Sequence, residues 1–132
     1  MDRTILVVED TPDVRDALKI LLELRGYKIV VASNGKEALS AADEHSPDLI
    51  LMDIAMPLVN GIDATRAIRA NTSTSHIPII CVSSFKHIYQ RQAIEAGCDA
   101  VYTKTELISN MEQILEKYLA ENEKERREEA AQ

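Results

Sequence analysis

The chain has 132 residues, which is enough for one hydrophobic core, and we expect no separate output module beside it. Its net charge of -7 leaves no basic excess that could displace the counterions of a nucleic acid, so we expect no nucleic-acid partner. Without a signal-peptide pattern or an apolar stretch of membrane-spanning length, the sequence favours a cytoplasmic protein that does not bind a membrane.

Five short apolar runs predict β-strands. They are rich in Val, Ile and Leu and do not alternate with polar residues, which is typical of strands buried on both faces of a parallel sheet. The runs cover residues 5–8, 29–32, 49–52, 79–82 and 100–102, and the last of them is the weakest.

Helical patterns lie between these runs. In the first, Val14, Leu18, Leu21 and Leu22 recur at the spacing of one buried helix face, with Thr11 expected as the N-cap and Gly26 as the stop. Asn34 is expected to cap a second helix that ends before Pro47. Two more helices are predicted at about 62–70 and 86–96, and the last carries Leu107, Met111, Ile114, Leu115 and Tyr118.

Strands that alternate with helices indicate βα units. Their right-handed crossovers place helices on both faces of a parallel sheet, so the predicted fold is a doubly wound α/β domain. Ligands of such sheets bind beyond the carboxyl ends of the strands.

Four of the predicted strands are followed by side chains that could take part in phosphate chemistry. These are Glu9 and Asp10 after the first strand, Asp53 after the third, Ser83 after the fourth and Lys104 after the fifth. Three gathered carboxylates would raise each other's pKa or need a cation between them, and hard oxygen ligands suit Mg²⁺. A carboxylate can also attack phosphorus, with Lys104 and Ser83 meeting the phosphoryl oxygens.

The chain resembles a receiver domain of two-component response regulators from about residue 3 to residue 119. The resemblance rests on Val7-Val8-Glu9-Asp10, on the segment from Asp48 to Met56-Pro57 with Gly61, and on Ser83 and Lys104. It implies a five-stranded parallel sheet of flavodoxin-like order 2-1-3-4-5, over a domain of residues 1–120. Residues 121–132 have no apolar face, so we expect a charged C-terminal helical extension or a frayed tail.

The resemblance also implies roles for these residues. Asp53 is the phosphoacceptor, and Glu9, Asp10, Asp53 and the backbone carbonyl of Ala55 hold Mg²⁺. Lys104 pairs with the acceptor or its phosphoryl group, and Ser83 turns toward that group and reports it to the surface. The catalytic set is therefore Asp53, Lys104 and Ser83, and the domain catalyses only its own phosphorylation and dephosphorylation.

Three positions depart from the family pattern. Thr105 follows Lys104 where the family usually has Pro behind a cis peptide, so we expect a trans bond or a differently shaped loop. Val101 stands at the position of the switch aromatic, and Tyr102 is one place off, on the opposite face of a strand. Phe85 stands where polar residues are common and, with Ala55, flanks the expected path of the attacking water.

These residues are compatible with three functions. The first is a stand-alone response regulator that a histidine kinase or histidine phosphotransfer protein phosphorylates, and that binds a downstream protein through its fourth helix, fifth strand and fifth helix. It would be a monomer or a phosphorylation-dependent dimer. The second is a receiver-like interaction module that is not phosphorylated, which Val101 and Thr105 motivate. The third, a Mg²⁺-dependent small-molecule phosphatase, lacks a DxD repeat and a cap insertion.

The histidines and cysteines are expected to lie outside the site. His45, His76 and His87 have no metal-ligand spacing and are read as surface residues. Cys81 is read as a small buried side chain, and nothing basic beside Cys98 in the sequence indicates a lowered pKa.

Overall fold

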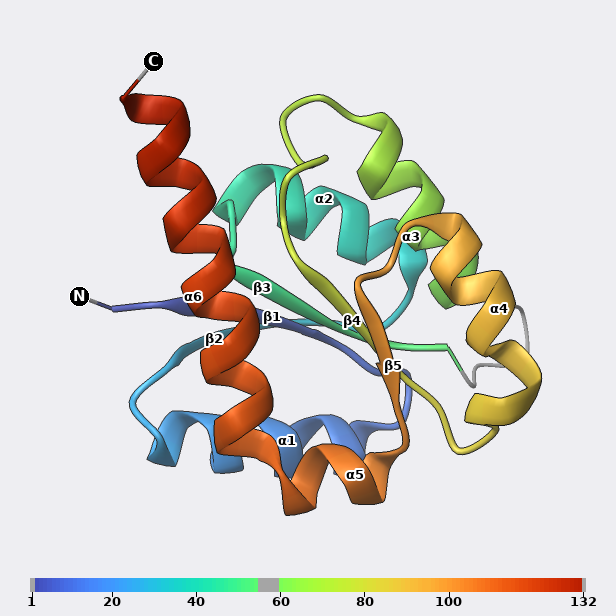
Figure 1. Cartoon of the computed structure of the whole chain (residues 1–132). Helices are drawn as coiled ribbons and strands as arrows, with labels where there is room; N and C mark the ends of the chain where they lie inside the picture. The colour runs from blue at the N-terminus through green and yellow to red at the C-terminus, as the bar shows by residue number, and fades with distance from the viewer. Residues whose placement is uncertain (1, 55–59, 132) are drawn as a thin grey trace.

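The computed structural model describes residues 2–54 and 60–131 (Figure 1). In chain order the elements are β1 (Thr4–Val8), α1 (Pro12–Leu24), β2 (Lys28–Ala32), α2 (Gly35–His45), β3 (Leu49–Asp53), α3 (Asn60–Ala70), β4 (Ile79–Val82), α4 (Lys86–Ala96), β5 (Ala100–Tyr102), α5 (Lys104–Ser109) and α6 (Met111–Ala130). All strand pairings are parallel, in the order β2-β1-β3-β4-β5. The predicted α/β fold and its strand order are confirmed.

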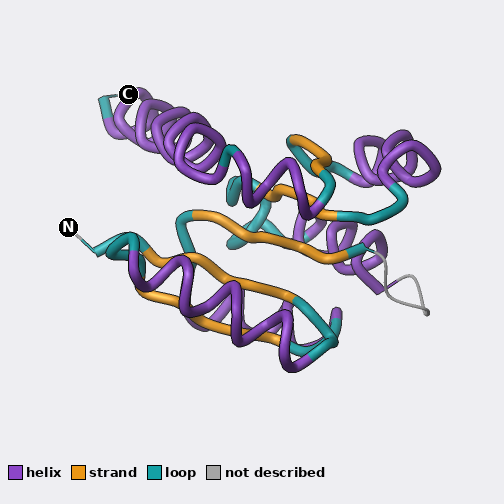
Figure 2. Tube along the Cα trace, turned by 90° about the horizontal axis from the view of Figure 1, so that it is seen from below, coloured by secondary structure: helices purple, strands orange, loops and turns teal. Residues whose placement is uncertain are grey.

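The sheet separates two hydrophobic cores, and helices cover both of its faces (Figure 2). Successive strand residues point to opposite faces, so Leu6 and Val8 join the core beneath α2, α3 and α4. Ile5 and Val7 join the core beneath α1, α5 and α6. This alternation within fully buried strands explains why the apolar runs show no polar alternation.

The expectation that every strand is buried on both faces is wrong for β2. Every residue of β3 and β4 is buried, but Lys28 is exposed and Val31 is 40% exposed. β2 lies at the edge of the sheet, where it has only β1 as a neighbour. Its apolar run therefore reflects an edge strand with one incompletely covered face.

The helix ends follow the predicted signals with one exception. Asn34 caps α2, because its side chain accepts a hydrogen bond from the Glu37 N–H at 2.9 Å. Thr11 occupies the N-cap position of α1, but its side chain makes no capping hydrogen bond. Gly26 has φ +94°, in the left-handed region, which ends α1.

The last predicted helix is divided in two at Asn110. Its φ of -124° departs from helical geometry, and both its backbone N–H and its side-chain amide donate to the Glu106 carbonyl at 3.1 Å. Asn side chains compete with the helical hydrogen-bond pattern in this way, so the apolar spacing continues across a break that it does not reveal. Beyond it α6 runs to Ala130 without a break at residue 120, and its last turns extend past the sheet (Figure 1).

In the described part of the chain, no helix combines the length and the apolar character needed to cross a membrane.

Candidate functional site

Three carboxylates meet at the carboxyl edge of the sheet. Glu9 and Asp10 follow β1, and Asp53 is the last residue of the neighbouring strand β3. Each of the three offers a carboxylate oxygen that lies within 4.8 Å of the other two. Glu9 is 2% exposed and Asp53 is 5% exposed, whereas Asp10 is open to solvent. The structure thus places two buried acids and one exposed acid in a single cluster.

The close approach of α3 to the end of β3 requires Gly61. A Cβ on this residue would lie 2.7 Å from the Ile54 side chain and 2.9 Å from the Ile54 Cα, and would also meet the Asp53 carbonyl. These distances are too short for real Cβ atoms. The glycine of the Asp48–Gly61 segment therefore allows the backbone of Asp53 to pack against α3.

Glu9 has an environment that opposes its ionisation. Burial, a hydrogen bond with Asp53 and the negative charge of Asp53 together raise the pKa of Glu9 from its ordinary 4.5 to about 7, although Lys104 lowers it. Its Oε1 accepts the Thr11 N–H at 3.3 Å. Near neutral pH the cluster therefore holds a proton that a cation could displace.

Lys104 reaches the cluster from the start of α5, just beyond the edge strand β5. Its Nζ lies 3.8 Å from Oε2 of Glu9. A reciprocal capping box fixes the start of its helix: the Glu106 N–H donates to Oγ1 of Thr103, and the Thr103 N–H donates to the Glu106 carboxylate. The peptide bond between Lys104 and Thr105 is trans, as expected from the absence of proline.

Ser83 lies directly after β4 and is fully buried. Its Oγ accepts the Phe85 N–H at 2.9 Å, and its own N–H extends the sheet by donating to the Tyr102 carbonyl at 3.0 Å. Phe85 is 51% exposed at the start of α4. The hydroxyl therefore holds the turn between β4 and α4.

Val101 and Tyr102 point to opposite faces of β5, as the sequence predicted. The β4–β5 register is continuous, so no bulge moves the aromatic ring. Val101 is buried in the core of α2, α3 and α4, and Tyr102 packs on the side of α5 and α6. The Tyr102 hydroxyl lies 3.4 Å from that of Tyr118 in α6.

A cavity of about 350 Å³ adjoins the cluster. It lies between α1 and α5, and Glu9, Asp53 and Lys104 border it. It exists because α1 covers the sheet incompletely: of the α1 residues only Leu22 is buried, and Leu21, which we expected on the buried face, is 38% exposed. Exposed apolar side chains thus lie close to the acidic cluster.

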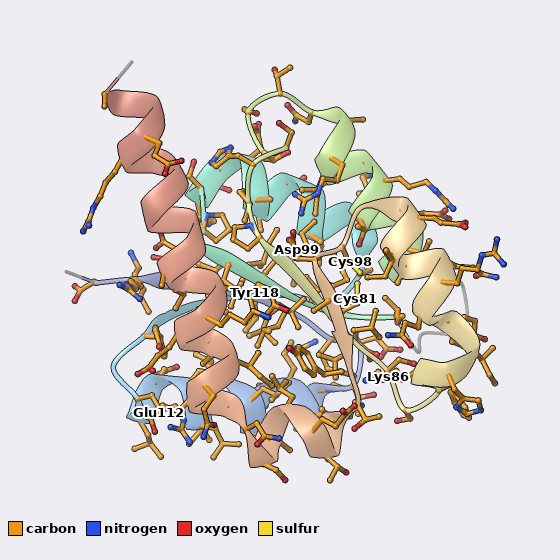
Figure 3. The ribbon with its side chains drawn as sticks, in the orientation of Figure 1. Cys81, Lys86, Cys98, Asp99, Glu112 and Tyr118 are labelled. Atoms are coloured by element: carbon orange, nitrogen blue, oxygen red, sulfur yellow. The ribbon has the colours of Figure 1, made fainter. Side chains whose placement is uncertain are left out.

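The remaining predicted residues lie elsewhere. Ala55, whose carbonyl is expected to bind Mg²⁺, falls outside the described residues. The three histidines are exposed, in agreement with the prediction. Cys81 and Cys98 are buried beneath α3 and α4 (Figure 3), where Cys81 lies 3.9 Å from the Thr65 hydroxyl.

Two neighbours of the site were not predicted from the sequence. Arg15 of α1 donates to the Glu9 carbonyl at 3.3 Å and to the Ser33 hydroxyl at 3.1 Å, a contact between distant segments with no local signal. Glu106 did have a signal, because Thr103 followed three residues later by Glu is a capping-box pattern. Recognising it would have placed Lys104 at the first position of a helix.

This arrangement suits the transfer of a phosphoryl group. Carboxylate oxygens can bind a hard cation, and a buried carboxylate beside that cation can act as a nucleophile toward phosphorus. The Lys104 ammonium beside the cluster can balance the charge of phosphoryl oxygens.

Comparisons with known proteins agree with the fold. The family model described as the response regulator receiver domain matches residues 5–117. The polar-differentiation response regulator DivK of Brucella anthropi is 34% identical over 122 residues, which cover 92% of this chain and 99% of DivK.

Two solved structures bear on the site. The receiver domain of the sensor histidine kinase PA1611 of Pseudomonas aeruginosa, which has a magnesium ion in its active-site cleft, is 27% identical with a TM-score of 0.82, covering 91% of this chain and 99% of that one. TrrA of Thermotoga maritima, a response regulator solved in complex with Mg²⁺-BeF, is 30% identical with a TM-score of 0.77, covering 88% and 98%.

Proposed function

Since the chain belongs to the response regulator receiver domain family, we propose that it accepts a phosphoryl group on Asp53 from a histidine kinase or a histidine phosphotransfer protein, and that the modification changes its binding to a downstream protein. The observation that carries the proposal is the placement of the buried Asp53 carboxylate beside Glu9, Asp10 and Lys104. A nucleophilic carboxylate, a cation site and an ammonium are the groups that this transfer needs.

The acidic cluster fits Mg²⁺. Glu9, Asp10 and Asp53 supply hard oxygen donors close enough to share one ion, and we assign the Ala55 carbonyl as a further ligand on the family pattern. Bound there, Mg²⁺ would neutralise charge on the phosphoryl oxygens. The magnesium-bound PA1611 and TrrA structures support this assignment.

Each side chain of the site has a role in the proposed transfer. A carboxylate oxygen of Asp53 forms a bond to phosphorus as the bond between phosphorus and the imidazole nitrogen of the donor breaks, and the donor histidine keeps that electron pair. Lys104 pairs with a phosphoryl oxygen, and the Ser83 hydroxyl leaves the Phe85 N–H to donate to another. The domain is thus a signalling phosphoacceptor.

Partner binding is assigned to two surfaces. The phosphodonor docks beside the cavity, which the exposed apolar side chains of Leu21 and Ile108 line together with Asp53. The downstream protein binds the surface of α4, β5 and α5, which adjoins Ser83. We place the protein in the cytoplasm, as a monomer or a phosphorylation-dependent dimer, with residues 1–120 as the receiver domain and 121–132 as a charged extension.

Intact-mass spectrometry after incubation with Mg²⁺ and acetyl phosphate tests the proposal. We expect one phosphoryl adduct on the wild type and none on Asp53→Ala or in the presence of a chelator. Asp63→Ala is the matched control, because Asp63 is an exposed aspartate of α3 outside the cluster, and this variant should still be labelled. A wild type that gains no adduct, and whose melting temperature does not respond to beryllofluoride, would overturn the proposal.

A wild type that gains no adduct and does not respond to beryllofluoride would favour a receiver-like interaction module that is not phosphorylated. The observation in its favour is the position of Tyr102, whose ring lies on the side of α5 and α6 and whose hydroxyl lies 3.4 Å from that of Tyr118. A ring held there does not lie on the face where the family's switch aromatic is expected. Labelling of Asp53 with unchanged partner binding would support the chemistry but not the switching.

A further inference from the structure

The turn between β4 and α4 connects the phosphorylation site to a second network. Phe85, the last residue before α4, donates its N–H to the Ser83 hydroxyl at 2.9 Å. Lys86, which follows it, is the first residue of α4. Any movement of the Ser83 hydroxyl toward a phosphoryl group removes the acceptor of the Phe85 N–H. The turn that carries Lys86 would then need a new arrangement.

Lys86 is tied across β5 to α5. Its Nζ lies 3.2 Å from Oε1 and 3.3 Å from Oε2 of Glu106, so it contacts both oxygens of one carboxylate. The same ammonium lies 5.8 Å from the centre of the Tyr102 ring, within the range of a cation–π interaction. Figure 3 shows Lys86 at the end of α4 that faces β5 and α5.

The partners of Lys86 are themselves fixed. Glu106 belongs to the capping box, where its Oε1 accepts the Thr103 N–H at 2.9 Å, and the Tyr102 hydroxyl contacts Tyr118 of α6. Lys86 is thus the member of the network nearest the turn, since it directly follows Phe85, whose N–H donates to the Ser83 hydroxyl. The two side chains of the ion pair are 28% and 42% exposed, so its strength is modest.

We propose that the ion pair between Lys86 and Glu106 is a latch that holds the turn between β4 and α4 in its unphosphorylated arrangement and opposes the movement of Ser83. The latch rests on the proposed function, since it regulates the response to phosphorylation of Asp53. When Ser83 turns, Lys86 moves with its helix and releases Glu106. Both charges then become available at the surface of α4, β5 and α5.

The latch predicts that its removal favours the phosphorylated arrangement. A protein whose competent arrangement is only fractionally populated binds its ligand less tightly by that fraction. Loss of a partly exposed ion pair should therefore tighten the apparent affinity for beryllofluoride, which stands in for the phosphoryl group, by about two- to fivefold.

Titration calorimetry of the full chain with beryllofluoride in the presence of Mg²⁺ tests the latch. Lys86→Met keeps the aliphatic stem, and Glu106→Gln keeps a side chain that suits a capping box. Each should tighten binding, and the double variant should gain no more than either single one. Arg91→Met is the matched control, because it breaks an ion pair within α4, with Glu95 at 3.1 Å, and should bind like the wild type.

Ser83→Ala provides the second control. Without the hydroxyl the latch has nothing to oppose, so adding Lys86→Met to Ser83→Ala should change the affinity by less than it does in the wild type. Unchanged or weaker binding by both Lys86→Met and Glu106→Gln would overturn the latch and leave the proposed function standing. A wild type that does not bind beryllofluoride would overturn the proposed function and the latch with it.

Discussion

Glu9 and Lys104 lie 3.8 Å apart although the strands that they follow, β1 and β5, are separated in the sheet by β3 and β4. The pair spans the carboxyl edge of the sheet, and Asp53 ends one of the two strands between them. Lys104 lowers the pKa of Glu9, but burial and Asp53 outweigh this effect and leave the pKa at about 7. The affinity of the site for a cation should therefore depend on pH near neutrality.

Mg²⁺ should bind more tightly as the pH rises to about 7 and should then level off, because the ion and a proton compete for Glu9. In the metal-free protein the free energy of unfolding depends on pH with the opposite sign. The raised pKa of Glu9 contributes stability that is fully present below about pH 4.5 and is lost as the pH rises through about 7. Titration calorimetry with Mg²⁺ at about pH 6 and about pH 8 should show that the Mg²⁺ affinity rises by at most about tenfold per pH unit below neutrality.

Glu23→Gln is the control for this pH dependence, because Glu23 is an exposed carboxylate on α1, paired only at 3.8 Å with Lys19. It should leave the pH profile unchanged, whereas Glu9→Gln should weaken Mg²⁺ binding at every pH. An affinity that stays constant between the two pH values in the wild type would contradict the assignment of the proton to Glu9.

Two threonines at N-cap positions should differ in their importance. Thr103→Ala removes the hydroxyl that accepts the Glu106 N–H at 3.0 Å and should lower the free energy of unfolding by about 1 kcal/mol. Because Lys104 is the first residue of that helix, labelling of Asp53 by acetyl phosphate should also slow. Thr11→Ala should stay within about 0.5 kcal/mol, since the Thr11 side chain makes no capping hydrogen bond. Urea denaturation and the labelling rate are the measurements, and equal losses for both variants would count against the capping box.

These two threonines also show what the sequence can predict. Thr11 followed by Pro12 has the composition of a helix start, and the helix does begin there, but the orientation of the Thr11 side chain is decided by its surroundings. Thr103 and Glu106 form a local pattern whose partners lie three residues apart, so it is readable in principle. Local signals therefore predict where a helix begins more reliably than which side chain stabilises it.

The grouping of the site residues was predictable because strand ends of a parallel sheet meet at one edge. Glu9, Asp10 and Asp53 are gathered for this reason. The contacts of Lys86 with Glu106, and of Arg15 with Glu9, connect segments whose relative positions depend on how the helices pack. Helix packing is not encoded at any fixed spacing, so neither contact could be predicted.

Gly61 and Gly26 should respond differently to alanine. Gly61→Ala places a Cβ against Asp53 and Ile54, so it should destabilise the fold by about 1–3 kcal/mol and weaken Mg²⁺ binding by displacing Asp53. Gly26→Ala meets no atom within 4 Å, but its φ of +94° should cost about 1–2 kcal/mol without changing Mg²⁺ affinity. Urea denaturation and Mg²⁺ titration of both variants separate the two effects. Normal Mg²⁺ affinity in Gly61→Ala would show that Asp53 tolerates the shift.

Arg69 should be the arginine of α3 on which stability depends most. Its guanidinium donates to the carbonyls of Gly97 at 2.8 Å and Ser75 at 3.0 Å, and contacts the Ile77 carbonyl at 2.6 Å and Asp99 at 3.0 Å. Asp99, which Figure 3 labels beside β5, in turn accepts the Ile79 N–H at 2.8 Å, so these contacts join α3 to the starts of β4 and β5.

Truncation would leave several of these carbonyls without their donor, so Arg69→Ala should lower the free energy of unfolding by roughly 2–4 kcal/mol. Arg69→Lys should recover only part of this, because an ammonium cannot reproduce the planar fork of a guanidinium. Arg66→Ala is the matched control on the same helix: its ion pair with Asp63 is 57% and 67% exposed, and its loss should stay within about 0.5 kcal/mol. Urea denaturation of the three variants measures the difference, and similar losses for Arg66→Ala and Arg69→Ala would refute the structural role of Arg69.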